Sequence, residues 1–182
     1  MRPIKGYNDA QASVGYTRLP AGGYIIKITG VEDVTDKQYL TIFFDIAEGP
    51  ERGRFKDVDL SDNKANWRCS FIHSYKETAL GMLKAFIQAV DASEETNYND
   101  FIEKGFDEQL QKGNKLGVVI GYEEYVNDRG ETKERMNVVR CCPVSDIREG
   151  KFTVPELKKL PATDPTSPVS GFTSIPDGDL PF

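Results

Sequence analysis

Few residues in this chain of 182 could build a metal centre or a disulfide framework. It has only 3 cysteines, two of them adjacent at positions 141 and 142, and 1 histidine. Structural zinc sites use four cysteine or histidine ligands, so we expect no metal site and no cofactor. An extracellular fold held together by disulfides is also excluded, which favours a reducing, cytoplasmic location.

Long apolar runs and catalytic motifs are missing as well. No stretch approaches the roughly 18 apolar residues of a membrane-spanning helix, and the first residues, MRPIK, lack the apolar segment of a signal peptide. The sequence has no nucleophile elbow, no Gly-Lys-Ser/Thr phosphate loop and no His-Glu-x-x-His pair. We therefore expect a protein that is not an enzyme and that has no membrane partner.

Basic residues are in deficit, but the deficit is uneven along the chain. There are 23 Lys and Arg against 29 Asp and Glu, a formal net charge of −6. Residues 161–182 carry three of the aspartates, no Lys or Arg, and five of the 10 prolines. Because this composition buries too little apolar surface to fold, we expect a disordered tail over residues 155–182.

The end of this tail combines carboxylates with apolar side chains. Proline stiffens it, and the last residue is a phenylalanine. This combination is typical of a peptide ligand for a basic-rimmed apolar pocket on another protein. The predicted partner-binding tip consists of Asp177, Asp179, Leu180, Pro181 and Phe182.

Alternating apolar residues predict five β-strands in the rest of the chain. They span residues 23–34, 38–48, 66–73, 114–125 and 131–142. Between the third and fourth strands, apolar residues at helical spacing predict an amphipathic helix over 75–91. Ser74 and Glu77 precede it at the spacing of a capping box. A second, short helix is predicted over 98–104.

This order of elements is that of an OB-fold. The OB-fold is a mainly β, five-stranded Greek-key barrel, here with a helix between strands three and four, that binds oligonucleotides or oligosaccharides on its strand 2–3 face. An open α+β sandwich would give a similar order. The predicted division of the chain is an N-terminal arm over 1–18, an OB-fold domain over 19–154 and the tail over 155–182.

Aromatic and basic side chains interleave on the strand faces opposite the apolar stripes and in the loop after the second strand. Binding of unpaired nucleotides needs flat rings to stack on bases and cations to neutralise phosphates. Structural explanations stay open: Phe43 and Trp67 could pack under a loop or in the core, and Lys133 and Arg135 could lie on a solvated strand edge. The predicted DNA-binding residues are Lys27, Tyr39, Phe43, Arg54, Phe55, Trp67, Arg68, Lys133 and Arg135.

The last six residues, Asp177-Gly178-Asp179-Leu180-Pro181-Phe182, give the chain a family resemblance. They resemble the acidic tip of bacterial single-stranded DNA-binding proteins, D-D-D-[IL]-P-F, and depart from it only at Gly178. Those proteins also join an OB-fold to a Pro/Gly/Ser-rich linker. Segments 19–24, 121–125 and 147–152 resemble, more loosely, the single-stranded DNA-binding proteins of phages and mobile elements of Gram-positive bacteria.

The resemblance implies a protein that coats single-stranded DNA without strong sequence preference during replication or recombination, in a bacterial or phage-infected cell. It also implies that the tip recruits replication, recombination and repair proteins, and that the chain forms a homo-oligomer. Two other classes remain open. The barrel could bind a protein, as an interaction adaptor does, or Glu123 and Glu124 could hold Mg²⁺ in a nuclease.

Overall fold

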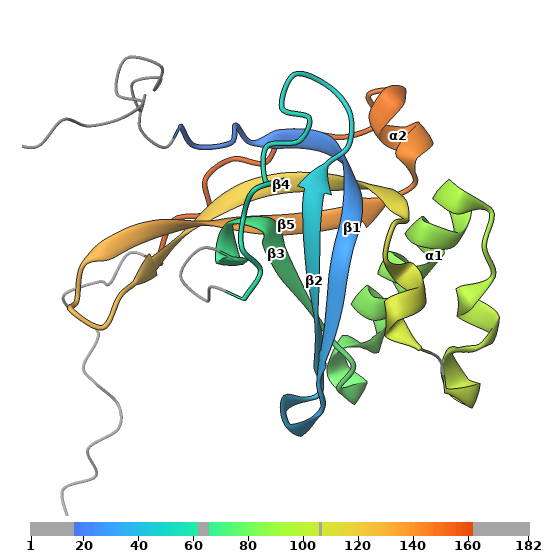
Figure 1. Ribbon diagram of the computed structural model, residues 1–182. Helices are drawn as coiled ribbons and strands as arrows, with labels where there is room; N and C mark the ends of the chain where they lie inside the picture. The colour runs from blue at the N-terminus through green and yellow to red at the C-terminus, as the bar shows by residue number, and fades with distance from the viewer. Residues whose placement is uncertain (1–16, 62–65, 106, 162–182) are drawn as a thin grey trace, which may run out of the picture.

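Five antiparallel strands form one sheet in the computed structural model, which describes residues 17–61, 66–105 and 107–161. The order across the sheet is β3-β2-β1-β4-β5. Figure 1 shows β4 and β5 crossing behind β1 and β2 at a steep angle, so the sheet is strongly bent. A mainly β fold with five antiparallel strands is thus confirmed. The strands are β1 (Gly22–Val34), β2 (Tyr39–Ile46), β3 (Ser70–Ser74), β4 (Lys115–Val126) and β5 (Thr132–Cys142).

The inner face of the bent sheet forms the core. Side chains alternate along a strand, so every second residue of β2 enters it: Leu40, Ile42, Phe44 and Ile46 are all buried. Ile26 and Ile28 of β1 and Leu116, Val118 and Ile120 of β4 join them. At Gly30 a bulge shifts the register of β1, which lets Val31 pair with Ile42 and stay in the core.

The hydrogen-bonded sheet is not closed into a barrel, which departs from the sequence prediction. β3 has only five residues and pairs with β2 alone, while β5 pairs with β4 alone. The two edge strands nevertheless meet through side chains. The Nε2 atom of His73 on β3 lies 3.6 Å from the Sγ atom of Cys141 on β5.

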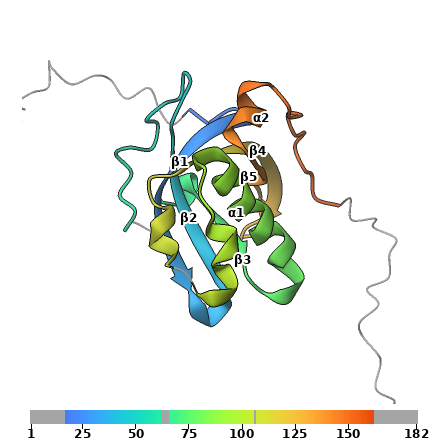
Figure 2. The same cartoon turned by 90° about the vertical axis from the view of Figure 1, so that its right-hand side faces the viewer.

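Helix α1 (Leu80–Glu94) follows β3 and covers the core, as Figure 2 shows. The ring of Phe86 meets Phe71 edge to face. The buried apolar residues of α1 are Leu83, Phe86, Ile87, Ala89 and Val90. Among the described residues no helix is long and apolar enough to cross a lipid bilayer.

The predicted capping box is wrong. The Ser74 hydroxyl donates to the carbonyl of Gln38 and accepts from the amide of Lys76. A 3-10 turn over Glu77–Ala79 comes first, and α1 begins at Leu80 with no side-chain cap. The short helix expected over 98–104 is present as two 3-10 turns, Tyr98–Asp100 and Ile102–Lys104.

The chain after β5 returns across the outer face of the sheet. Helix α2 (Val144–Arg148) sets Ile147 against Gly117, where a Cβ atom would lie 2.6 Å from the Ile147 side chain. The ring of Phe152 covers Gly23 in the same way. Further on, Lys158 exchanges two backbone hydrogen bonds with β4, at Tyr122 and Glu124. Residues 155–160, assigned to the tail from sequence, therefore include a segment held against β4.

Candidate nucleic-acid interface

A row of charged side chains crosses the outer face of the sheet. Lys27 of β1 pairs with Asp45 of β2 on one side and with Lys115 of β4 on the other. Directly paired residues of antiparallel strands point to the same face. Lys27 is exposed, as its position opposite the apolar stripe predicts.

Two loops add cations beside this row and enclose a cleft of about 600 Å³. Residues 52–56 follow β2, and residues 112–115 lead into β4. The second segment is held there by backbone hydrogen bonds that join Ile28 to Gly113 and Asn114. We name the hollow the cationic cleft, after the five basic residues that line it: Lys27, Arg52, Lys56, Lys112 and Lys115.

The positive charge of the cleft is largely uncompensated. Its one acidic residue, Asp45, accepts hydrogen bonds from the amides of Ile46 and Phe55, both at 2.8 Å. Lys115 lies 3.4 Å from Glu48, a carboxylate that also binds Arg148. The hydrogen bond from Arg148 has the largest effect on the pKa of Glu48 and lowers it. Burial opposes this effect, and a hydrogen bond from Lys115 adds to it, so the net pKa is lowered.

The other four cations form no ion pair within the described part of the chain. The side chains of Lys27, Arg52, Lys56 and Lys112 are therefore exposed in a hollow where none of them forms an ion pair with Asp45 or another described carboxylate. A groove of this kind attracts a polyanion, and its concave walls raise the local field.

Two of the predicted stacking platforms are buried. Phe43 does lie on the outer face, but it is only 8% exposed. The loop after β2 returns over the sheet there and brings Leu60 close to both Phe43 and Gly30. Phe55 is 6% exposed and belongs to the core, where its ring meets Phe44 edge to face at 5.7 Å. Neither ring is available to a base in this structure.

Three aromatic or apolar side chains remain accessible around β2 and β3. Trp67 is 49% exposed and lies in the 3-10 turn Asn66–Cys69 that leads into β3, with the guanidinium carbon of Arg68 5.7 Å from its ring centroid. Tyr39 is half-buried. Ile72, on the same face as Tyr39, is 58% exposed.

The remaining predicted cations are engaged elsewhere. Arg54 is mostly buried, pairs with Glu51 and donates to the carbonyl of Thr17. Lys133 and Arg135 lie on the β4–β5 hairpin, where they pair with Glu131 at 3.2 Å and Glu123 at 2.7 Å. The structure does not bring these three into the cationic cleft.

The two glutamates considered for a metal site do not converge. Glu123 pairs with Arg135 and lies 3.7 Å from Lys158, whereas Glu124, next along the strand, accepts from the amide of Leu160. Across residues 17–61, 66–105 and 107–161, no cluster of three or more His, Cys, Asp or Glu could hold a metal ion.

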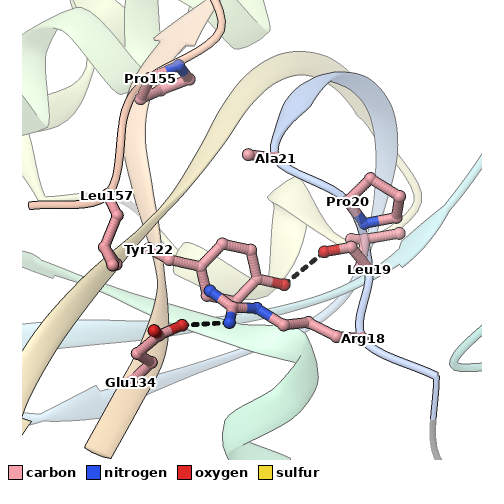
Figure 3. Close-up of a pocket in the computed structure, with 8 residues that line it drawn as sticks. All are labelled: Arg18, Leu19, Pro20, Ala21, Tyr122, Glu134, Pro155 and Leu157. Atoms are coloured by element: carbon pink, nitrogen blue, oxygen red, sulfur yellow. Dashed lines mark hydrogen bonds and ion pairs between the residues drawn. The ribbon is translucent and has the colours of Figure 1, made fainter.

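A second hollow, of about 390 Å³, lies where residues 18–21 meet the β4–β5 hairpin (Figure 3). The guanidinium carbon of Arg18 is 3.2 Å from the ring centroid of Tyr122, and Arg18 also forms an ion pair with Glu134. Burial lowers the pKa of Arg18, but hydrogen bonds with Glu134 and Tyr122 outweigh that effect and raise it. We name this hollow the Arg18 pocket; it is also lined by Leu19, Pro20, Ala21, Pro155 and Leu157.

Sequence analysis missed most of the cationic cleft. Lys112 and Lys115 are far in sequence from Lys27 and have no motif around them. Arg52 and Lys56 flank Phe55, so the basic character of the loop was visible, but the buried ring was not. The partner-binding tip, residues 177–182, lies outside the described residues. Compared with known protein families and with curated proteins, the chain has no match.

Proposed function

We propose that this protein binds single-stranded DNA without strong sequence preference, with the phosphates in the cationic cleft. The observation that carries the proposal is the cleft itself: five basic residues from two strands and two loops, four of them without an ion pair among the described residues. Counterion release from neutralised phosphates supplies most of the affinity of such sites.

The arrangement of strands also supports an OB-type domain. The order β3-β2-β1-β4-β5, with α1 between β3 and β4, is compatible with a five-stranded barrel left open between β3 and β5. The contact of His73 with Cys141 is where such a barrel would close. Oligonucleotides bind across the outer wall of these domains, on which Lys27, Tyr39 and Ile72 lie.

Single strands are favoured over duplexes because the accessible side chains near β3 suit unpaired bases. The ring of Trp67 can stack on any base, a contact worth roughly 1–3 kcal/mol. In a duplex the bases are stacked on each other and cannot reach such a ring. The proposal thus assigns phosphate contacts to the cleft and base contacts to Trp67, with Tyr39 and Ile72 as neighbours.

Fluorescence anisotropy with labelled oligo-dT and with a duplex of equal length tests this function. We expect tighter binding of the single strand, and at least tenfold weaker binding by the double variant Lys27→Glu, Lys56→Glu. Lys76→Glu, Lys84→Glu is the control, because it makes the same change in charge at exposed positions around the start of α1. Equal losses in both variants would show that net charge, rather than the cleft, governs binding.

The tip is proposed to recruit other proteins of DNA metabolism. Asp177 and Asp179 would meet a basic rim, and Leu180 and Phe182 an apolar pocket, on replication, recombination or repair enzymes. Deletion of residues 177–182 should abolish capture of those enzymes and leave oligo-dT affinity equal or tighter. Assembly into a homo-oligomer stays a prediction, to be checked by sedimentation.

A protein-interaction adaptor is the second candidate, favoured by the exposure of Trp67 and Ile72. Exposed aromatic and aliphatic side chains of this kind anchor protein interfaces. The anisotropy experiment separates the two candidates: an adaptor would bind neither oligonucleotide, and its affinity for a protein partner would depend on Trp67 rather than on the cleft lysines.

A further inference from the structure

The Arg18 pocket is a preformed recess that the phosphate-binding role of the cleft leaves unused. Leu19 is buried in the core and its carbonyl accepts a hydrogen bond from the Tyr122 hydroxyl. The Tyr24 hydroxyl donates to the carbonyl of Pro20 at 2.7 Å. These contacts fix the chain on both sides of the recess, so binding of a ligand there would cost little conformational entropy.

The planar guanidinium of Arg18 forms one wall of the recess. The guanidinium of Arg18 lies against the ring of Tyr122, and its edge is held by Glu134 (Figure 3). The Arg18 side chain is nevertheless 46% exposed, which leaves part of the guanidinium plane open. Guanidinium planes are stacking platforms for unpaired bases. The apolar walls, Pro20, Pro155 and Leu157, suit the edges and face of a ring.

The pocket adjoins the cationic cleft through the loop after β2. Arg52 and Lys56 of that loop line the cleft, while Arg54, between them, donates to the carbonyl of Thr17, the residue before Arg18. A strand of DNA that leaves the cleft along this loop would reach the recess.

Glu134 adds selectivity. A carboxylate accepts hydrogen bonds at about four lone-pair positions, so the ion pair with Arg18 leaves room for another donor. Cytosine and adenine carry an amino donor where thymine carries a carbonyl oxygen. Thymine keeps only its N3–H donor, which two carbonyl oxygens flank. A carboxylate beside this edge therefore attracts the first two bases more strongly than the third.

We propose that the Arg18 pocket binds one unpaired nucleobase, stacked on the guanidinium of Arg18 and hydrogen-bonded to Glu134, and that it favours cytosine and adenine over thymine. The inference rests on the proposed function, since it needs a DNA strand in the cleft. It adds a weak base preference to a protein that otherwise binds any sequence.

The test compares labelled oligo-dC and oligo-dT of equal length in anisotropy titrations with the full chain. We expect the unmodified protein to bind oligo-dC about 3-fold or more tightly than oligo-dT. Glu134→Gln should bring this ratio close to one, because the neutral amide both donates and accepts. Arg18→Lys keeps the charge and removes the plane, so it should weaken binding of both oligonucleotides by about 5-fold or more.

Arg140→Lys is the matched control, because Arg140 is also a half-exposed arginine paired with a carboxylate, that of Asp146, on the outer side of β5. It should change neither affinity nor ratio, and the unfolding midpoint of each variant verifies its fold. Equal binding of the two oligonucleotides, or an Arg18→Lys variant indistinguishable from Arg140→Lys, would overturn the base pocket even if the cleft variant still loses affinity. Absence of all oligonucleotide binding would overturn the proposed function as well.

Discussion

The imidazole of His73 lies between two elements that share no backbone hydrogen bond with each other. Its ring stacks on Phe86 of α1, with centroids 4.8 Å apart, and its Nε2 atom reaches Sγ of Cys141 on β5. Burial lowers the pKa of His73 from 6.5 to about 4. A neutral imidazole on the edge strand β3 thus contacts both α1 and β5, the opposite edge strand of the sheet.

Stability should fall as the pH drops from 6.5 toward 4. In that window the unfolded chain binds a proton at His73 and the folded chain does not, so protonation favours unfolding. Protonation of the unfolded chain should lower the free energy of unfolding by about 2 kcal/mol at pH 5 relative to pH 7. Urea titrations at pH 7 and pH 5 measure it. His73→Phe should reduce this pH dependence. If the difference in unfolding free energy between pH 7 and pH 5 stays the same in the variant, other groups cause it.

The cysteines should be poor nucleophiles in the native protein. Burial raises the pKa of Cys69 to about 11 and, with a smaller effect of Cys142, that of Cys141 to about 12. Burial raises the pKa of Cys142 too. At pH 8 almost no thiolate is present, so reaction with Ellman's reagent should be slow until guanidinium unfolds the chain and releases three thiols. A thiol that reacts within seconds in native protein would contradict this arrangement.

Salt should weaken oligo-dT binding in proportion to the cations in the cleft. If all five contact phosphates, log K against log salt concentration has a slope of about −3.5, and each substitution to alanine should reduce its magnitude by about 0.7. Titrations of Lys27→Ala and Lys112→Ala at several salt concentrations measure the change. Lys84→Ala, on α1, should leave the slope as it is. A slope unaffected by the cleft variants would place the phosphates elsewhere.

Trp67 and Phe55 should respond differently to truncation. Trp67→Ala should weaken oligo-dT binding by about 1–3 kcal/mol and leave the fold intact, since the ring is half exposed. Phe55→Ala should instead lower the free energy of unfolding by about 3–5 kcal/mol, because it leaves a cavity in the core. Parallel denaturation and binding curves separate the two effects. Loss of stability in the Trp67 variant would mean that this ring serves the fold.

Local pattern was enough to find the strands and the main helix. β1, β2, β4 and β5 lie within two residues of their predicted bounds, because they are rich in β-branched and aromatic residues and turn residues lie beside them. The predicted start of α1 was too early, since Ser74 bonds to Gln38, a partner on another element. Helix α2 was missed because five residues are too few to show a helical period.

The candidate site was harder to predict than the strands, because loops determine which side chains line it. Alternation placed Phe43 on the outer face correctly, but the return of Leu60 over that face, which buries the ring, leaves no local signal. Lys112 lines the cleft beside Gly113, whose amide donates to the carbonyl of Ile28 on β1. Long-range contacts of this kind set which basic residues face one another, and a single sequence does not reveal them.

Backbone pairing of Lys158 with β4 has a consequence for strand addition between copies of this chain. β1 begins opposite Ile120, so beyond Ile120 one edge of β4 would present amide and carbonyl groups without backbone partners. The hydrogen bonds from Glu124 to Lys158 and from Lys158 to Tyr122, each 2.9 Å, occupy that edge. A protein shortened before Phe152 would leave it open to intermolecular strand addition, and it should aggregate at concentrations that the longer chain tolerates.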